Sequence, residues 1–154
     1  MKKILIALDY DPTAQQVAET GFKLAKSLCA EVVLLHVITN DEYYTTTGQS
    51  PVPGFDSIGP WKLLLDTEDL SEQLQKSLEE IKNKLGNENT QILIKEGDFA
   101  KSILETAKEM ELKIIVMGSH SRKWLEDIVM GSVTEKVIKH TSIPVFIVPT
   151  GKKK

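Results

Sequence analysis

Five short apolar runs divide the chain, and each has the length of a buried strand. They are Ile4–Leu8, Val32–Val37, Gln91–Ile94, Ile114–Met117 and Val145–Val148. Three of them, ILIAL, VVLLHV and IIVM, are continuous rather than alternating. Continuous apolar runs are typical of a parallel sheet that helices cover on both faces. We therefore expect five strands of one such sheet.

Four of the segments between these runs have apolar residues at the 3.6-residue period of a helix. The periodic positions are Val17, Gly21, Leu24, Ala25 and Leu28; Leu70, Leu74, Leu78, Ile81 and Leu85; Ile103, Leu104, Ala107 and Met110; and Val133, Val137 and Ile138. Asp11-Pro12 is a suitable cap and first-turn pair for the first helix, and Gly86 ends the second. This alternation of strands and helices predicts an α/β doubly wound fold with a five-stranded parallel sheet.

The length of 154 residues allows one domain, which we place at residues 1–150, followed by a basic tail at 151–154. Residues 38–62 fit neither period and contain three prolines and three glycines. A connection of this length in a compact domain is usually functional or disordered. It is read equally well as a lid over a site and as an inserted loop.

Composition excludes several classes of function. The net charge of −3 argues against a nucleic-acid partner, because binding to a nucleic-acid backbone usually shows as a concentrated basic surface. No apolar run has membrane-spanning length, so no membrane association is expected. A single cysteine, Cys29, cannot form a disulfide or a thiolate metal cluster within the chain. The default is a cytoplasmic protein without a metal site.

Unusual residues follow the first and fourth predicted strands. Asp9 follows the first, and Gly118-Ser119-His120-Ser121 ends the fourth. In an open parallel sheet, ligands bind beyond the carboxyl ends of the strands, where the strand order reverses. Gly131-Ser132 would bring the positive N-terminus of a helix to the same crevice, which makes it an anion site. Such a crevice suits a nucleotide, with its base near Asp9 and its phosphates near Gly131.

Each of these residues also has a purely structural interpretation. Ser132 and Glu135 form a capping-box pattern that a helix favours without any ligand. His36, inside an apolar run, is more typical of a buried imidazole with hydrogen-bond partners than of a ligand-binding residue. Cys29 follows an apolar helix face and is expected in the core. No Walker lysine loop is present and no nucleophile lies beside an evident base, so no catalytic residue is predicted.

With these residues in place, the sequence resembles the universal stress protein family along nearly its whole length. The segments that carry the resemblance are KKILIALDYDPTAQQVAETGFKLAKSLCAEVVLLHVI, EGDFAKSILETAKEMELKIIVMGSHS and GSVTEKVIKHTSIPVFIVP. Nucleotide-binding members of that family carry the motif Gly-x2-Gly-x9-Gly-Ser/Thr. Gly118 and Gly131-Ser132 match this motif at the required spacing, whereas Ser121 replaces the second glycine.

The resemblance implies the strand order 3-2-1-4-5 of an adenine-nucleotide alpha-hydrolase-like three-layer sandwich. It implies ATP, with or without Mg²⁺, as the ligand. Matched residue by residue, Asp9 and Val37 would flank the adenine and ribose. The positions that would surround the ribose and phosphates are Met117, Gly118, Ser121, Gly131, Ser132, Val133 and Thr134.

The resemblance also implies a homodimer that forms through the last strand, Val145–Val148. The resulting prediction is a dimeric ATP-binding module of stress response or signalling, with a further, unidentified protein partner. Two alternatives stay open. One is a nucleotide-free universal stress protein that acts as an interaction protein, which Ser121 favours. The other is an enzyme that hydrolyses ATP slowly.

Overall fold

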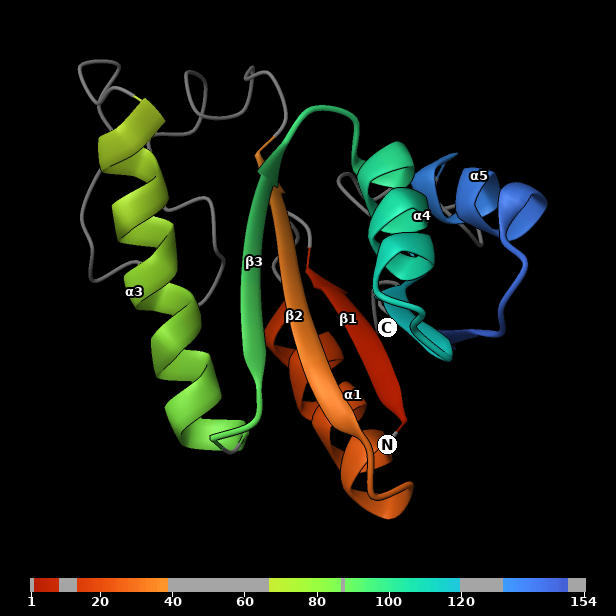
Figure 1. Cartoon of the computed structure of the whole chain (residues 1–154), viewed down its shortest axis with the longest axis horizontal. Coiled ribbons are helices and arrows are strands. Elements are labelled where there is room, and N and C mark those ends of the chain that lie inside the picture. Colours follow the sequence, from red (N-terminus) through yellow and green to blue (C-terminus); the bar gives the residue numbers. More distant parts are fainter. Residues whose placement is uncertain (1, 9–13, 39–66, 87, 120–131, 150–154) are drawn as a thin grey trace, which may run out of the picture.

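The computed structural model describes residues 2–8, 14–38, 67–86, 88–119 and 132–149. Its elements follow one another as strands alternating with helices (Figure 1). In chain order they are β1 (Lys3–Leu8), α1 (Ala14–Ser27), β2 (Glu31–Ile38), α3 (Thr67–Leu85), β3 (Gln91–Glu96), α4 (Phe99–Glu109), β4 (Ile114–Gly118), α5 (Ser132–His140) and β5 (Val145–Val148). All five predicted strands and all four predicted helices are present.

The strands form one parallel sheet in the order β3-β2-β1-β4-β5, as predicted. The central strand β1 pairs with β2 on one side, Ile6 opposite Leu34, and with β4 on the other, Ile6 opposite Val116. Ile38 is the last residue of β2, so the long connection begins one residue later than expected. The rest of that connection, residues 39–66, lies outside the described residues.

The helices cover both faces of the sheet and produce two separate cores. Side chains of β2 alternate between them: Leu34 and Ile38 pack with α1 and α3, whereas Leu35 and Val37 pack with α4 and α5. Figure 1 shows α3 on one side of the sheet, and α4 and α5 together on the other. This is why the strand sequences are continuously apolar: both of their faces are buried.

Helix ends are fixed by local hydrogen bonds. The carboxylate of Asp98 caps α4 by accepting a hydrogen bond from the backbone N–H of Lys101, 2.8 Å away. The end of α1 is a Schellman turn, in which the Ala30 N–H donates to the Ala25 carbonyl at 2.9 Å and Cys29 adopts a left-handed φ of 53°. That turn places the Cys29 thiol at the surface, so the expectation that it lies in the core was wrong.

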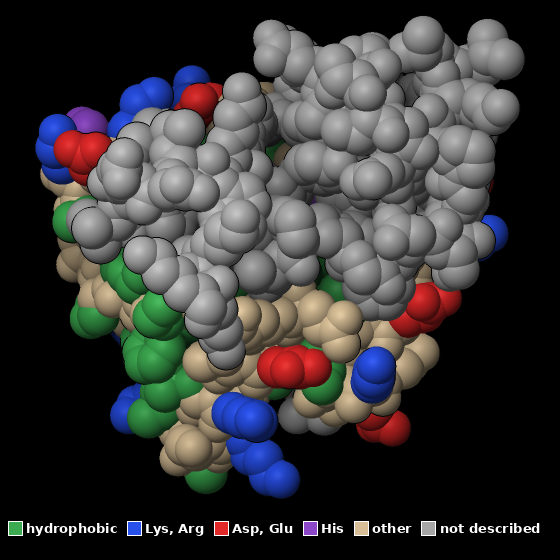
Figure 2. Space-filling model, turned by 180° about the vertical axis from the view of Figure 1, so that it is seen from behind, with side chains coloured by type: hydrophobic (Ala, Val, Ile, Leu, Met, Phe, Trp, Pro, Cys, Tyr) green, Lys and Arg blue, Asp and Glu red, His purple; other side chains and the backbone are tan. Residues whose placement is uncertain are grey.

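Among the described residues, three large apolar side chains are exposed: Leu28, Ile138 and Phe146. Leu28 and Ile138 were assigned to buried helix faces, but Leu28 lies just beyond the last turn of α1, and Ile138 points outward from α5. Figure 2, seen from behind, shows apolar side chains gathered along one side of the molecule, while described charges of both signs are scattered. The edge strand β3 is also only partly buried.

Candidate functional site

The crevice predicted from the sequence lies where the strand order reverses. β1 and β4 are neighbours in the sheet and run in parallel, so their carboxyl ends lie side by side. The helix that follows β1 packs on one face of the sheet, and the helix that follows β4 packs on the other. The chain therefore leaves β1 toward one face of the sheet and leaves β4 toward the other, which is the geometry of a ligand-binding switch point.

The side chain of Thr134 joins the first turn of α5 to the end of β4. This fully buried hydroxyl donates to the Gly118 carbonyl at 2.9 Å, and it lies 3.4 Å from the Ser119 carbonyl. The backbone N–H of Ser119 in turn donates to the Val148 carbonyl of β5 at 2.9 Å. These bonds hold the N-terminal turn of α5 at the carboxyl end of the sheet.

The electrostatics of this end of α5 are those of a helix N-terminus. The first backbone N–H groups of a helix have no partner within it, and the helix dipole adds positive potential there. The carboxylate of Glu135 is paired with Lys139 at 3.4 Å, one turn further along the helix. The Thr134 hydroxyl has no hydrogen left for an anion, because it already donates to a carbonyl. Among the described groups of this turn, backbone N–H groups are thus the donors for an anion.

The structure locates six of the nine predicted site residues. Val37 and Met117 are buried in the core between the sheet and helices α4 and α5, and Val133 packs against the same core. Gly118 ends β4, Ser132 begins α5, and Thr134 connects these two elements. Five of the six, all except Val37, therefore belong to β4 or to the first turn of α5. The remaining three, Asp9, Ser121 and Gly131, lie outside the described residues, so their part in a site stays a prediction.

His36 is the polar residue whose environment was wrongly predicted. Its ring is fully buried near the carboxyl end of β2, where alternation along the strand points it toward α1 and α3. Neither ring nitrogen makes a well-formed hydrogen bond in the part of the chain that the structure describes. Loss of hydration lowers its pKa from 6.5 to about 4, and the Leu8 backbone beside it offsets this only weakly. Burial was predicted correctly, but of the expected hydrogen-bond partners the described residues supply only the poorly formed contact with the Leu8 backbone.

The sequence did not single out the pairing of Thr134 with the end of β4. Thr134 entered the predicted site by resemblance alone, as a residue near the phosphates. A signal was nevertheless present, because a hydroxyl on the inner face of the first helical turn can satisfy the last carbonyls of an adjacent strand. Among the described residues, no group of three or more side chains could hold a metal ion. No described helix is long and apolar enough to cross a bilayer.

Comparison with known proteins places the chain among relatives that match it over almost its entire length. The sequence profile of the Universal stress protein family matches residues 1–149. Universal stress protein MJ0531 of Methanocaldococcus jannaschii is 34% identical over 157 residues, which cover 99% of this chain and 84% of that protein. Universal stress protein MJ0577 of the same organism is 34% identical over 158 residues, 96% of this chain and 94% of that protein.

Solved structures agree with the sequence comparison. The structure of MJ0577 superposes with a TM-score of 0.73 at 29% identity and covers 99% of this chain and 98% of its own. The fold is shared by a universal stress protein in complex with cAMP, at 14% identity and a TM-score of 0.65 over 97% of this chain and 98% of that one. A universal stress protein from Archaeoglobus fulgidus in complex with dAMP has 20% identity and a TM-score of 0.57 over 96% and 97%. The chain belongs to the universal stress protein family.

Proposed function

We propose that this protein binds an adenine nucleotide, ATP in the first instance, in the crevice above β1 and β4, and that occupancy controls its interaction with a protein partner. The base and ribose lie near Asp9 and Val37. The phosphates lie along Gly118, Ser121 and the N-terminus of α5. Mg²⁺, which is usually bound in part by substrate phosphates, accompanies the nucleotide.

The attachment of α5 to β4 is the observation that carries this proposal. The Thr134 hydroxyl fixes the start of α5 to the Gly118 carbonyl at 2.9 Å, at the end of a strand adjacent to β1. The helix N-terminus, which attracts anions, is thus held at the switch point of the sheet before any ligand arrives. A preorganised site loses little entropy on binding, which favours affinity.

The relatives make the nucleotide the first choice of ligand. Universal stress proteins of the same fold have been solved in complex with cAMP and with dAMP. Both ligands combine an adenine ring with a phosphate, which is the chemistry expected of a crevice with an apolar wall and a helix N-terminus. We propose that Val37 and Met117, whose side chains are buried in the core beside α4 and α5, supply the apolar wall in this chain.

Ser121 sets the strength of binding that we expect. Where a backbone position needs a positive φ, a residue other than glycine costs about 1–2 kcal/mol, which is about tenfold in affinity. We therefore propose ATP binding that is detectable but modest. The second candidate function, a nucleotide-free interaction protein, is favoured by this same serine. We propose no catalytic residue, and at most slow ATP hydrolysis.

We further propose that two chains pair through β5. This strand forms one edge of the sheet and has a neighbour, β4, on one side within the described chain. Its Phe146 side chain is 40% exposed, and Val145 and Ile147 are half-buried. An apolar edge strand is prone to pair with another strand, and pairing with a second copy would cover it. The exposed free thiol of Cys29 fits the reducing cytoplasm as the compartment.

A thermal-shift panel tests the proposed ligand. The purified protein is melted with ATP, ADP, AMP, cAMP and GTP, and the gain in melting temperature reports ligand that binds only the folded state. We expect adenine nucleotides to stabilise the protein and GTP to have little effect. Equal shifts for all nucleotides would indicate non-specific anion binding. No shift with any of them would favour the nucleotide-free interaction protein.

A further inference from the structure

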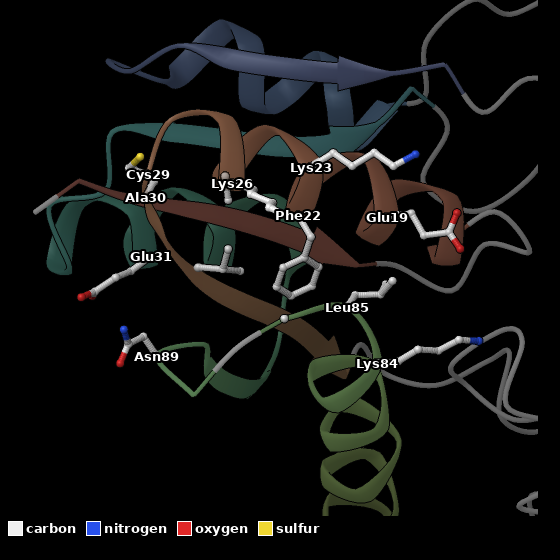
Figure 3. Close-up of a pocket in the computed structure, with 13 residues that line it drawn as sticks. Glu19, Phe22, Lys23, Lys26, Cys29, Ala30, Glu31, Lys84, Leu85 and Asn89 are labelled. Atoms are coloured by element: carbon white, nitrogen blue, oxygen red, sulfur yellow. The ribbon is translucent and has the colours of Figure 1, made fainter.

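A hollow lies at the opposite end of the strands from the proposed nucleotide crevice. It is a groove between the C-terminal halves of α1 and α3, next to the start of β2, with a volume of about 890 Å³ (Figure 3). We call it the α1–α3 groove. Its apolar floor consists of Phe22 and Ala25 from α1, Val32 from β2 and Leu85 from α3. The volume lies within the range of ligand-binding pockets.

The absence of a side chain at Gly86 shapes this floor. A Cβ atom at this position would lie 2.9 Å from Cε1 of Phe22 and 2.7 Å from Oγ1 of Thr90. Both distances are shorter than a carbon atom normally accepts. With glycine at this position, the Phe22 ring can extend from α1 to the end of α3, where Figure 3 shows it close to Leu85. The groove therefore has a continuous aromatic and aliphatic base.

Positive charge without a partner surrounds the apolar floor. Lys23 and Lys26 on α1 and Lys84 on α3 are exposed, and none of them forms an ion pair with a carboxylate of the described residues. Two carboxylates also lie on the rim, so its three lysines leave it net positive. Glu31 pairs with Lys3 at 4.0 Å, and Glu19 accepts a hydrogen bond from Gln15 at 3.3 Å.

We propose that the α1–α3 groove docks an acidic amphipathic helix of a partner protein. A helix of this kind lays its apolar face into an apolar groove between two helices, and its flanking side chains meet the rim. Here the floor would receive leucine-type side chains, and the three lysines would receive carboxylates. The lining comes from two helices and the start of a strand, with apolar side chains at its base and lysines from both helices beside them. The site is separate from the crevice, so the proposal does not depend on nucleotide binding.

A designed peptide serves as the probe. It is a fluorescein-labelled amphipathic helix of about five turns, with leucines on one face and glutamates on the other. One control peptide has every glutamate replaced by lysine, and a second has every leucine replaced by serine. Binding to the full-length protein is followed by fluorescence anisotropy at low and high salt. We expect the acidic amphipathic peptide to bind best, and more weakly in high salt.

Two protein variants separate the groove from general charge. The groove variant carries Lys23→Glu, Lys26→Glu and Lys84→Glu. The control variant carries Lys76→Glu, Lys108→Glu and Lys113→Glu, which change the net charge equally at exposed positions outside the groove. All six positions are exposed, so both variants should fold, which circular dichroism verifies. We expect the groove variant to lose about tenfold or more in affinity and the control variant about twofold or less.

Cys29 adds a direct measurement of position. It is the only cysteine of the chain, its thiol is exposed, and it lies at one end of the groove. A dye attached to it should be quenched by the same peptide carrying a nitroxide at one end. The proposal would be overturned if the peptide bound without quenching the dye from either end. It would also be overturned if the two triple variants lost affinity equally. Preference for the basic peptide, preference for anionic phospholipid vesicles, or self-association that the groove variant abolishes would overturn it too.

Discussion

The buried imidazole of His36 makes the stability of this protein depend on pH in a direction that can be worked out. The pKa of His36 is about 4 in the folded chain and 6.5 in the unfolded chain. Between these values the unfolded chain binds a proton that the folded chain excludes. The contribution of neutral His36 to the free energy of unfolding is therefore fully present above pH 6.5 and is lost as the pH falls toward 4.

The size of the effect follows from the same two values. The difference between 6.5 and about 4 corresponds to about 3 kcal/mol in the free energy of unfolding. About 2 kcal/mol of this is already lost when the pH reaches 5. The variant His36→Leu removes this dependence. Because neither ring nitrogen has a well-formed hydrogen bond among the described residues, the substitution gives up only the weak contact with the Leu8 backbone and should be neutral or stabilising at pH 7.

Urea unfolding at pH 7, 6 and 5, followed by far-ultraviolet circular dichroism, tests this prediction. We expect the free-energy difference between His36→Leu and the natural protein to grow by about 2 kcal/mol from pH 7 to pH 5. His140→Gln is the matched control, because His140 is exposed on the last turn of α5. It should follow the natural protein. Parallel pH profiles for the natural protein and His36→Leu would refute the reasoning.

Two further predictions concern α5 and β5. Thr134→Val keeps the shape of a fully buried side chain but removes the 2.9 Å hydrogen bond to the Gly118 carbonyl. We expect the free energy of unfolding in urea to fall by about 1–2 kcal/mol, and the thermal shift with ATP to become smaller. An unchanged ATP shift in a destabilised variant would separate this bond from the site. Phe146→Lys should move the protein from dimer to monomer in sedimentation, whereas Ile138→Lys, at a similarly exposed position on α5, serves as a control. A natural protein that is already monomeric, or no change in mass, would contradict pairing through β5.

Much of the fold could be predicted from the sequence because the relevant signals are local. Continuous runs such as IIVM and VVLLHV occur where both faces of a strand are covered, and the two cores on β2 show why. The first and fourth predicted strands were expected to be neighbours on the strength of a crevice argument and a resemblance, and the pairing of Ile6 with Val116 confirms it.

The features that the sequence could not predict depend on where helices end and on how distant segments pack together. Cys29 follows an apolar helix face by period, but α1 ends at Ser27 and the Schellman turn rotates the thiol to the surface. His36 was expected to have hydrogen-bond partners, yet whether a buried ring finds one depends on the geometry of neighbouring strands and helices, which periodicity does not encode. For the candidate site, the sequence named Thr134 without its role, because its bond to Gly118 spans sixteen residues.

Isothermal titration calorimetry with ATP tests the central claim most directly, on the natural protein and on two variants. Ser121→Gly restores the second glycine of the motif, and Gly131→Val obstructs the approach to the N-terminus of α5. We expect modest binding by the natural protein, about tenfold tighter binding by Ser121→Gly, and none by Gly131→Val, with all three proteins equally folded. Tight binding by the natural protein would show that serine is accommodated there without strain. Absence of binding even by Ser121→Gly would contradict the claim that this crevice holds a nucleotide.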